Sequence, residues 1–257
     1  MNGRDERNAA SDHALAAALA ADAADLLCKL RARGDLTGRE LGTEGDRRSH
    51  EHLMGRLGRE RPRDAVLSEE GRDDHARIEA TRVWIIDPLD GTREYGERAR
   101  TDWAVHIALW SDGDLAAGAV ALPALDIVLA TPSVSALPAR DPQRRVRVVV
   151  SRSRAPKLAL DVAAAIGADV VELGSAGAKT AAVVRGEADA YLHAGGQYEW
   201  DSAAPVAVAR AAGLHASRVD GSPLAYNQRD VYLPDLLVCR RELAATLLDA
   251  IRAALAT

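Results

Sequence analysis

The stretch "VWIIDPLDGTREY" constrains the fold more than any other part of the sequence. It begins with an apolar run typical of a buried strand and then presents Asp87 and Asp90 on either side of a Pro-Leu pair. Pro88 cannot donate to a strand ladder and Gly91 permits a tight turn, so we predict that the strand ends at Asp87. Both carboxylates then face one pocket at the end of a buried strand.

The first 140 residues are predicted to form an α+β half. A helix capped by Ser11 or Asp12 and ended by Gly34 carries leucines at helical spacing, and a second helix follows Asp46. Strands are expected at "AVLS", "VWIID" and "DWAVHIALW", and "SDGD" turns the chain into "LAAGAVALP" as a hairpin.

Strands and helices are expected to alternate after about Asp141. The expected order is strand "RVRVVVS", helix "LALDVAAAIG", strand "DVVEL", a helix after "GSAGAK", strand "DAYLHA", a helix after "WDSAAP", strand "DLLVCR" and helix "ELAATLLDAIRAALA". We therefore predict one compact unit, a layered α/β/α/β/α sandwich, with an N-terminal subdomain at 1–140 and a C-terminal subdomain at 141–257.

Composition limits the possible partners. The 257 residues are 47% hydrophobic and 28% charged, and no apolar run approaches the roughly 20 residues that span a bilayer. A formal charge of -5 gives no overall attraction to nucleic acid. Asp22 and Asp25 interrupt the first apolar segment, so it does not read as a signal peptide. We expect a cytoplasmic protein that binds neither membrane nor nucleic acid.

Further acids lie where other predicted elements begin or end. Glu69 and Glu70 follow a strand, Asp201 opens a helix, and Asp46 lies in "TEGD". Taken one at a time, each acid is more simply explained as a turn or helix-cap residue. Taken together, ligands made only of oxygen favour a hard divalent ion such as Mg²⁺.

The chemistry implied by such a cluster is metal-assisted phosphate hydrolysis. Two metal ions can clamp the attacking and leaving oxygens of an in-line displacement. The backbone N–H groups of Gly91 and Thr92 can hold the phosphate, and the Thr92 hydroxyl can orient the water if Asp46 takes its proton.

At these residues the chain resembles the inositol monophosphatase superfamily. The two signatures are "DPLDGT" at 87–92 and "WDSAA" at 200–204, and a Glu-Glu pair precedes the first. The resemblance implies an α/β/α/β/α fold and a lithium-sensitive, Mg²⁺-dependent phosphatase. "DPLDGTREY", "VLSEE", "SRS" and "GSAGAK" are similar to the CysQ-type 3'(2'),5'-bisphosphate nucleotidases. The implied substrate is 3'-phosphoadenosine 5'-phosphate, a by-product of sulfate activation, which is converted to AMP and phosphate.

The resemblance also implies roles for individual residues around two or three Mg²⁺ ions. Glu69, Asp87 and the Leu89 carbonyl would hold the first ion, and Glu69 would reach a third through water. The second ion would be held by Asp87, Asp90 and Asp201. Thr92 and Asp46 would activate the water, with Glu70 in support. The implied substrate contacts are Glu69, Leu89, Asp90, Gly91, Thr92, Ser151, Ser153, Ser175, Lys179 and Asp201.

Several alternatives stay open at this point. Lys179 is equally explained as a solvated helix residue. His106 and His193 are expected to pack or hydrogen-bond locally, because a Mg²⁺ site made of oxygens needs no imidazole. The chain departs from many relatives in "DLTGRELGTEGD", which keeps Thr43 and Asp46 but lacks their Lys and Ser-Pro.

The overall activity has alternatives too. A broader phosphatase acting on inositol 1-phosphate or fructose 1,6-bisphosphate would use the same acids, and a non-catalytic nucleotide-binding sensor would use the same fold. Relatives are often homodimers, so a homodimer is an expectation drawn from the resemblance alone.

Overall fold

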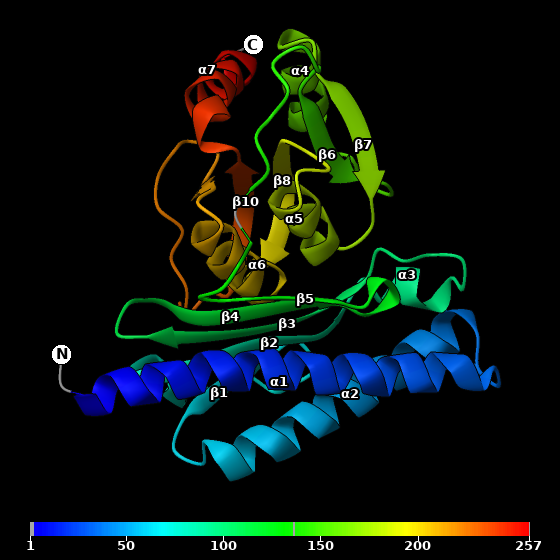
Figure 1. Ribbon diagram of the computed structural model, residues 1–257, viewed down its shortest axis with the longest axis vertical. Helices are drawn as coiled ribbons and strands as arrows, with labels where there is room; N and C mark the ends of the chain where they lie inside the picture. Colours follow the sequence, from blue (N-terminus) through cyan, green and yellow to red (C-terminus); the bar gives the residue numbers. More distant parts are fainter. Residues whose placement is uncertain (1–2, 136, 257) are drawn as a thin grey trace.

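Two long helices cover one face of the first β-sheet. The computed structural model describes residues 3–135 and 137–256, in which α1 spans Gly3–Arg33 and α2 spans Gly38–Glu60 (Figure 1). Leu19, Leu27 and Leu53 are fully buried in the core that these helices share with the sheet. The first layer of the sandwich is therefore a pair of helices with one apolar side each.

The first sheet has five strands in the order β1-β2-β3-β4-β5. They span Ala65–Ser68, Arg82–Asp90, Ala104–Ser111, Asp114–Leu122 and Ile127–Ala130. β1 pairs with β2 in parallel and the other pairs are antiparallel. The expected hairpin is confirmed, with Asp112 and Gly113 at positive φ in its turn.

The second sheet lies on the far side of two central helices (Figure 1). Its order is β7-β6-β8-β10-β9. β6 to β10 span Arg147–Ser151, Asp169–Leu173, Ala190–Tyr198, His215–Ser217 and Tyr232–Cys239. The central helices are α5 (Ala176–Val184) and α6 (Glu199–Ala211), and the outer helices are α4 (Lys157–Ala165) and α7 (Ala244–Leu255).

The order of these layers confirms the predicted α/β/α/β/α sandwich. Three buried clusters fill the spaces between layers: one under α1 and α2, one around α5 and α6, and one under α4 and α7. Short elements complete the chain: α3 (Thr92–Gly96), η1 (His75–Glu79), η2 (Pro123–Leu125) and η3 (Arg241–Leu243). Each sheet thus has a buried cluster on both faces, and strands β2, β3 and β6 carry long apolar runs.

The predicted start of the first helix is wrong. α1 begins at Gly3, so Ser11 and Asp12 lie inside it and neither caps it. Asp12 is only 4% exposed and pairs with Arg61 at 2.8 Å, which ties α1 to the end of α2. The predicted end is confirmed, because Gly34 follows the helix with φ of 81°.

The second helix also begins earlier than predicted, at Gly38 rather than after Asp46. Two of its glycines allow close packing against α3. A Cβ atom on Gly42 would lie 2.7 Å from Cγ2 of Thr92, and one on Gly45 would lie 2.7 Å from Cε1 of Tyr95. Asp46 is therefore held on a helix that touches the "DPLDGT" turn.

The predicted end of β2 at Asp87 is wrong as well. Asp87 lies opposite His106 and Asp90 lies opposite Ala104, so three steps along β2 match two along β3. This mismatch is a β-bulge, which accommodates Pro88 inside a strand. α5 and α6 also start before the predicted positions, since "GSAGAK" and "WDSAAP" lie at their first turns.

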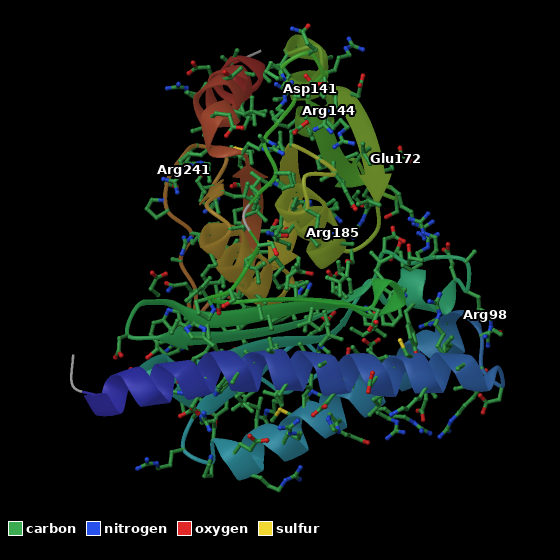
Figure 2. All side chains as sticks on the ribbon, viewed as in Figure 1. Arg98, Asp141, Arg144, Glu172, Arg185 and Arg241 are labelled. Carbon is green, nitrogen blue, oxygen red and sulfur yellow. The ribbon has the colours of Figure 1, made fainter. Side chains whose placement is uncertain are left out.

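Charged side chains cover the outside of the sandwich (Figure 2). Arg98, Glu172 and Arg241 are examples of exposed residues of both signs. Within residues 3–135 and 137–256, no helix combines the length and the apolar character needed to cross a membrane.

Close packing of β4 on α6 should make Gly118 sensitive to substitution. A Cβ atom there would lie 2.5 Å from Cβ of Ala207, so Gly118→Ala is expected to destabilise the protein by about 1–3 kcal/mol. Gly58 lies in α2 with nothing within 4 Å of its Cβ position, so Gly58→Ala is the matched control and should be neutral or stabilising. Equal melting temperatures for the two variants would contradict this account.

Candidate functional site

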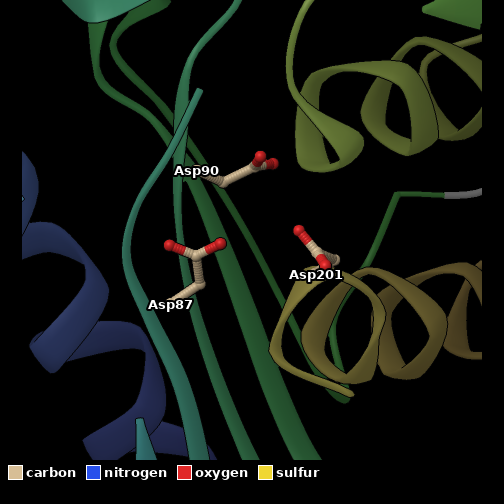
Figure 3. Close-up of side chains that lie close together, drawn as sticks. All are labelled: Asp87, Asp90 and Asp201. Atoms are coloured by element: carbon tan, nitrogen blue, oxygen red, sulfur yellow. The ribbon is translucent and has the colours of Figure 1, made fainter. Parts of the chain in front are cut away.

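Three aspartates from distant parts of the chain converge between the first sheet and the central helices. Asp87 and Asp90 flank the bulge of β2, and Asp201 lies in the first turn of α6 (Figure 3). One carboxylate oxygen from each lies within 4.8 Å of the others. The bulge lets two residues of one strand turn toward one point, and α6 brings the third acid to it.

Backbone N–H groups hold each carboxylate in place. Leu89 N–H donates to Oδ1 of Asp87 at 3.0 Å, and Gly177 N–H in α5 donates to Oδ2 of Asp90 at 2.6 Å. Oδ2 of Asp201 accepts from the backbone N–H that precedes α6, also at 2.6 Å. Asp201 therefore caps the helix, as the simpler interpretation expected, and still faces the other two acids.

Burial and mutual repulsion change the protonation of this cluster. Burial, followed by the charges of Glu69 and Asp90, raises the pKa of Asp87 well above its ordinary value. Burial and the charge of Asp90 raise the pKa of Asp201 to about 6. Burial also acts on Asp90, but His106 outweighs it and lowers the pKa of that carboxyl. A cation bound among these acids would relieve their repulsion.

Glu69 extends the cluster from the end of β1. The residue is open to the cavity, yet protein atoms surround its carboxyl group, and this desolvation together with the charge of Asp201 raises its pKa to about 7. The carboxyl group also hydrogen-bonds with Asp87. Glu70 is exposed and contributes through its charge, which acts on Asp46.

Thr92 and Asp46 form a second group beside the aspartates. Oγ1 of Thr92 lies 3.5 Å from Oδ1 of Asp46 and donates to the carbonyl oxygen of Leu89 at 3.2 Å. Burial, followed by the charges of Glu70 and Glu69, raises the pKa of Asp46 to about 8. The predicted pair is thus adjacent, because α2 packs directly on the turn that carries Thr92.

A cavity of about 600 Å³ opens beside these acids. The predicted site residues that line it are Glu69, Asp90, Gly91, Thr92, Ser151, Ser153, Lys179 and Asp201. The loop after β6 forms part of its wall, with Oγ of Ser151 3.5 Å from Oγ of Ser153. Arg152 anchors this loop to α3 by donating to Glu94 and Glu97, each at 2.7 Å.

Ser175 and Lys179 are both buried, and of the two only Lys179 lines the cavity. Oγ of Ser175 accepts from Ala178 N–H at 2.8 Å, so this buried serine caps α5. Lys179 is 3% exposed and its Nζ donates to the carbonyl oxygens of Gly174 and Ser175. The alternative in which Lys179 is a solvated helix residue is therefore wrong.

His106 is the residue next to the cluster whose position the sequence did not indicate. It is fully buried, with Nε2 3.1 Å from Oδ2 of Asp90 and Nδ1 3.1 Å from the carbonyl oxygen of Trp200. Burial opposes its positive charge, but Asp90 outweighs burial and raises the pKa of His106. His106 was expected to pack or hydrogen-bond locally, but its hydrogen-bond partner Trp200 lies 94 residues away in the sequence. The contact with Asp90 depends on strand register, which the sequence does not reveal.

The sequence of this chain is similar to those of known proteins. The model of the inositol monophosphatase family matches residues 7–256. The chain is 50% identical over 266 residues to the 3'-phosphoadenosine 5'-phosphate phosphatase of Mycobacterium leprae, covering 97% of this chain and 96% of that protein. It is 54% identical over 239 residues to the phosphatase of the same name from Mycobacterium tuberculosis, covering 90% and 89%.

A solved structure is similar over nearly the whole chain. The crystal structure of CysQ from Bacteroides thetaiotaomicron, described as a bacterial member of the inositol monophosphatase family, superposes with a TM-score of 0.78 at 26% identity. The superposition covers 90% of this chain and 97% of that one.

The raised pKa values predict how stability depends on pH without metal. Asp46, Glu69 and Asp201 have folded-state pKa values of about 8, 7 and 6, above the roughly 4 of unfolded carboxyl groups. These three groups then bind more protons in the folded state between about pH 4 and pH 8, so their contribution to the free energy of unfolding falls as pH rises through this window. The lowered pKa of Asp90 affects the free energy of unfolding only below this pH window.

The measurement is the melting temperature in a chelating buffer from pH 5 to pH 8. We expect it to fall with rising pH, and we expect Asp201→Asn to fall less steeply because one titrating group is removed. A melting temperature that is flat or rises over this range would contradict the crowding of acids described above.

Proposed function

This chain belongs to the inositol monophosphatase family, and from that premise we propose that it is a Mg²⁺-dependent phosphatase that hydrolyses 3'-phosphoadenosine 5'-phosphate to AMP and phosphate. The observation that carries the proposal is the convergence of Asp87, Asp90 and Asp201 beside a cavity of about 600 Å³. The names of the mycobacterial relatives support the choice of substrate.

The donor set fits a hard divalent ion. Its side-chain groups are carboxylates, they are crowded, and their repulsion is only partly balanced by His106. We propose that Glu69, Asp87 and the Leu89 carbonyl hold one Mg²⁺, that Asp87, Asp90 and Asp201 hold a second, and that Glu69 reaches a third through water. When bound, these ions would polarise the phosphate and lower the pKa of a water molecule.

The residues beside the ions would prepare the attacking water. Asp46 would accept a hydrogen bond from the Thr92 hydroxyl, since the two oxygens lie 3.5 Å apart. The Thr92 oxygen would then be free to accept a hydrogen bond from the water and fix its direction of attack. Glu70 would act through its charge on Asp46, and the Gly91 and Thr92 N–H groups would face the phosphate.

The rest of the substrate would lie along the cavity. Ser151, Ser153 and Lys179 line it and would contact the nucleotide, while Ser175 would support it as the cap of α5. Such an enzyme would remove the by-product of sulfate activation and transfer. A cytoplasmic location and a homodimer remain predictions, as does the lithium sensitivity that the resemblance implies.

A substrate panel tests the proposed specificity. We expect kcat/KM for 3'-phosphoadenosine 5'-phosphate to exceed that for inositol 1-phosphate and fructose 1,6-bisphosphate by about 100-fold, which corresponds to about 2.7 kcal/mol in the transition state. Phosphate release is measured below saturation, with and without Mg²⁺. Comparable rates on all three would favour the broader phosphatase, and tight nucleotide binding without turnover would favour the sensor.

A single substitution tests the metal site. Asp90→Asn removes one charge from the cluster and should lower Mg²⁺-dependent kcat/KM by about 100-fold or more. Mg²⁺ should raise the melting temperature of the wild-type protein by mass action, and raise it less in this variant. Asp112→Asn is the matched control, because Asp112 is exposed in a turn whose positive φ suits Asn. Equal effects of the two substitutions would contradict the assignment of Asp90 as a metal ligand.

A further inference from the structure

One wall of the cavity contains residues that the proposed hydrolysis does not use. Gln197 and Tyr198 end β8, and Trp200 follows in the first turn of α6; all three line the same cavity as Asp90 and Asp201. Of this stretch, the chemistry described above needs Asp201 alone. The wall therefore calls for a separate explanation.

Gln197 has an amide without partners. The residue is 7% exposed, and among the described residues neither its Nε2 nor its Oε1 has a hydrogen-bond partner. A buried amide that makes no hydrogen bonds is unfavourable, and most such groups are paired. Since no described residue bonds this amide, a ligand in the cavity that Gln197 lines would supply its missing partners.

Tyr198 contributes an aromatic ring to the same cavity. Its ring stacks on Trp200, with centroids 4.9 Å apart and planes at 18°, and it remains 47% exposed. Tyr232 from β10 meets it edge-on at 6.2 Å and closes over Gly196, where a Cβ atom would collide with the Tyr232 ring. The ring of Tyr198 is therefore held rigidly while part of it stays open.

A flat ring and a free amide together suit a purine base. A glutamine amide offers one donor and one acceptor side by side, which match N6–H and N7 of adenine. An aromatic ring stacks on the face of any base. Inositol and fructose phosphates have hydroxyl groups but no aromatic face, so they would gain little from this wall.

We propose that Gln197 and Tyr198 form an adenine subsite that selects the nucleotide among phosphate esters. The inference deepens the proposed function and rests on it, because it assumes that the phosphate is cleaved at the aspartate cluster. Gln197 reads the edge of the base and Tyr198 stacks against it. The volume of the cavity, about 600 Å³, falls within the range of sites for small ligands.

Kinetics with two substrates test the subsite. The measured quantity is the ratio of kcat/KM for 3'-phosphoadenosine 5'-phosphate to kcat/KM for inositol 1-phosphate, which lacks a base. Gln197→Met keeps the length of the side chain and removes the amide donor and acceptor that would bond the base. Tyr198→Ala removes the ring. Each substitution should lower the ratio about tenfold. Tyr198→Phe keeps the ring and should restore most of the ratio.

The chain offers a matched control for the glutamine. Gln143 is exposed on the loop before β6, so Gln143→Met makes the same chemical change away from the cavity and should leave the ratio unchanged. Melting temperatures of all variants show whether each one folds. An unchanged ratio in Gln197→Met and Tyr198→Ala, or equal losses on both substrates, would overturn the subsite even if the enzyme prefers the nucleotide.

Binding separates failure of the subsite from failure of the proposed function. We expect the wild-type protein with Mg²⁺ to bind AMP about tenfold more tightly than ribose 5-phosphate, and Gln197→Met to lose most of that difference. If AMP shows this preference but no substrate is hydrolysed, the subsite stands and the phosphatase proposal fails. If AMP binds no better than ribose 5-phosphate, the subsite is wrong whatever the enzyme hydrolyses.

Discussion

Repulsion among Asp87, Asp90 and Asp201 must be balanced for this chain to fold, because their carboxylate oxygens lie within 4.8 Å of one another in a buried setting. Groups of the protein itself balance part of this repulsion. The Gly177 N–H donates a hydrogen bond to Asp90, and His106 lies 3.1 Å from the same carboxylate. These contacts lower the pKa of Asp90 but leave those of its neighbours raised. A bound cation would relieve the remaining imbalance, and its binding would then stabilise the folded state.

Different layers of the sandwich supply the acids of this cluster. Asp87 and Asp90 come from the first sheet, and Asp201 comes from a central helix that packs on that sheet through Gly118. On the opposite face, α2 approaches the turn so closely that Gly42 has no room for a side chain, which brings Asp46 to Thr92. Glycines outside the acidic cluster therefore help to form the site, because they let the layers pack closely enough to bring its acids together.

Much of the fold was predictable from the sequence, since most strands and the layer order follow from apolar periodicity and from alternation of strand and helix. The errors have physical causes. The first two helices begin earlier than predicted, because Asp12 pairs with Arg61 rather than capping α1 and Gly42 packs on Thr92 inside α2. β2 continues past Pro88 because a bulge accepts the proline, and no local pattern distinguishes a bulge from a strand end.

The sequence by itself determined which groups carry charge near the site: the acids of the "DPLDGT" and "WDSAA" stretches, with Glu69 beside them, are recognisable by type and order. Tertiary structure alone decided that His106 meets Asp90, that Lys179 is buried, and that the amide of Gln197 has no hydrogen-bond partner among the described residues. The reason is that motifs describe neighbours along the chain, whereas these contacts depend on strand register and on how closely the layers pack.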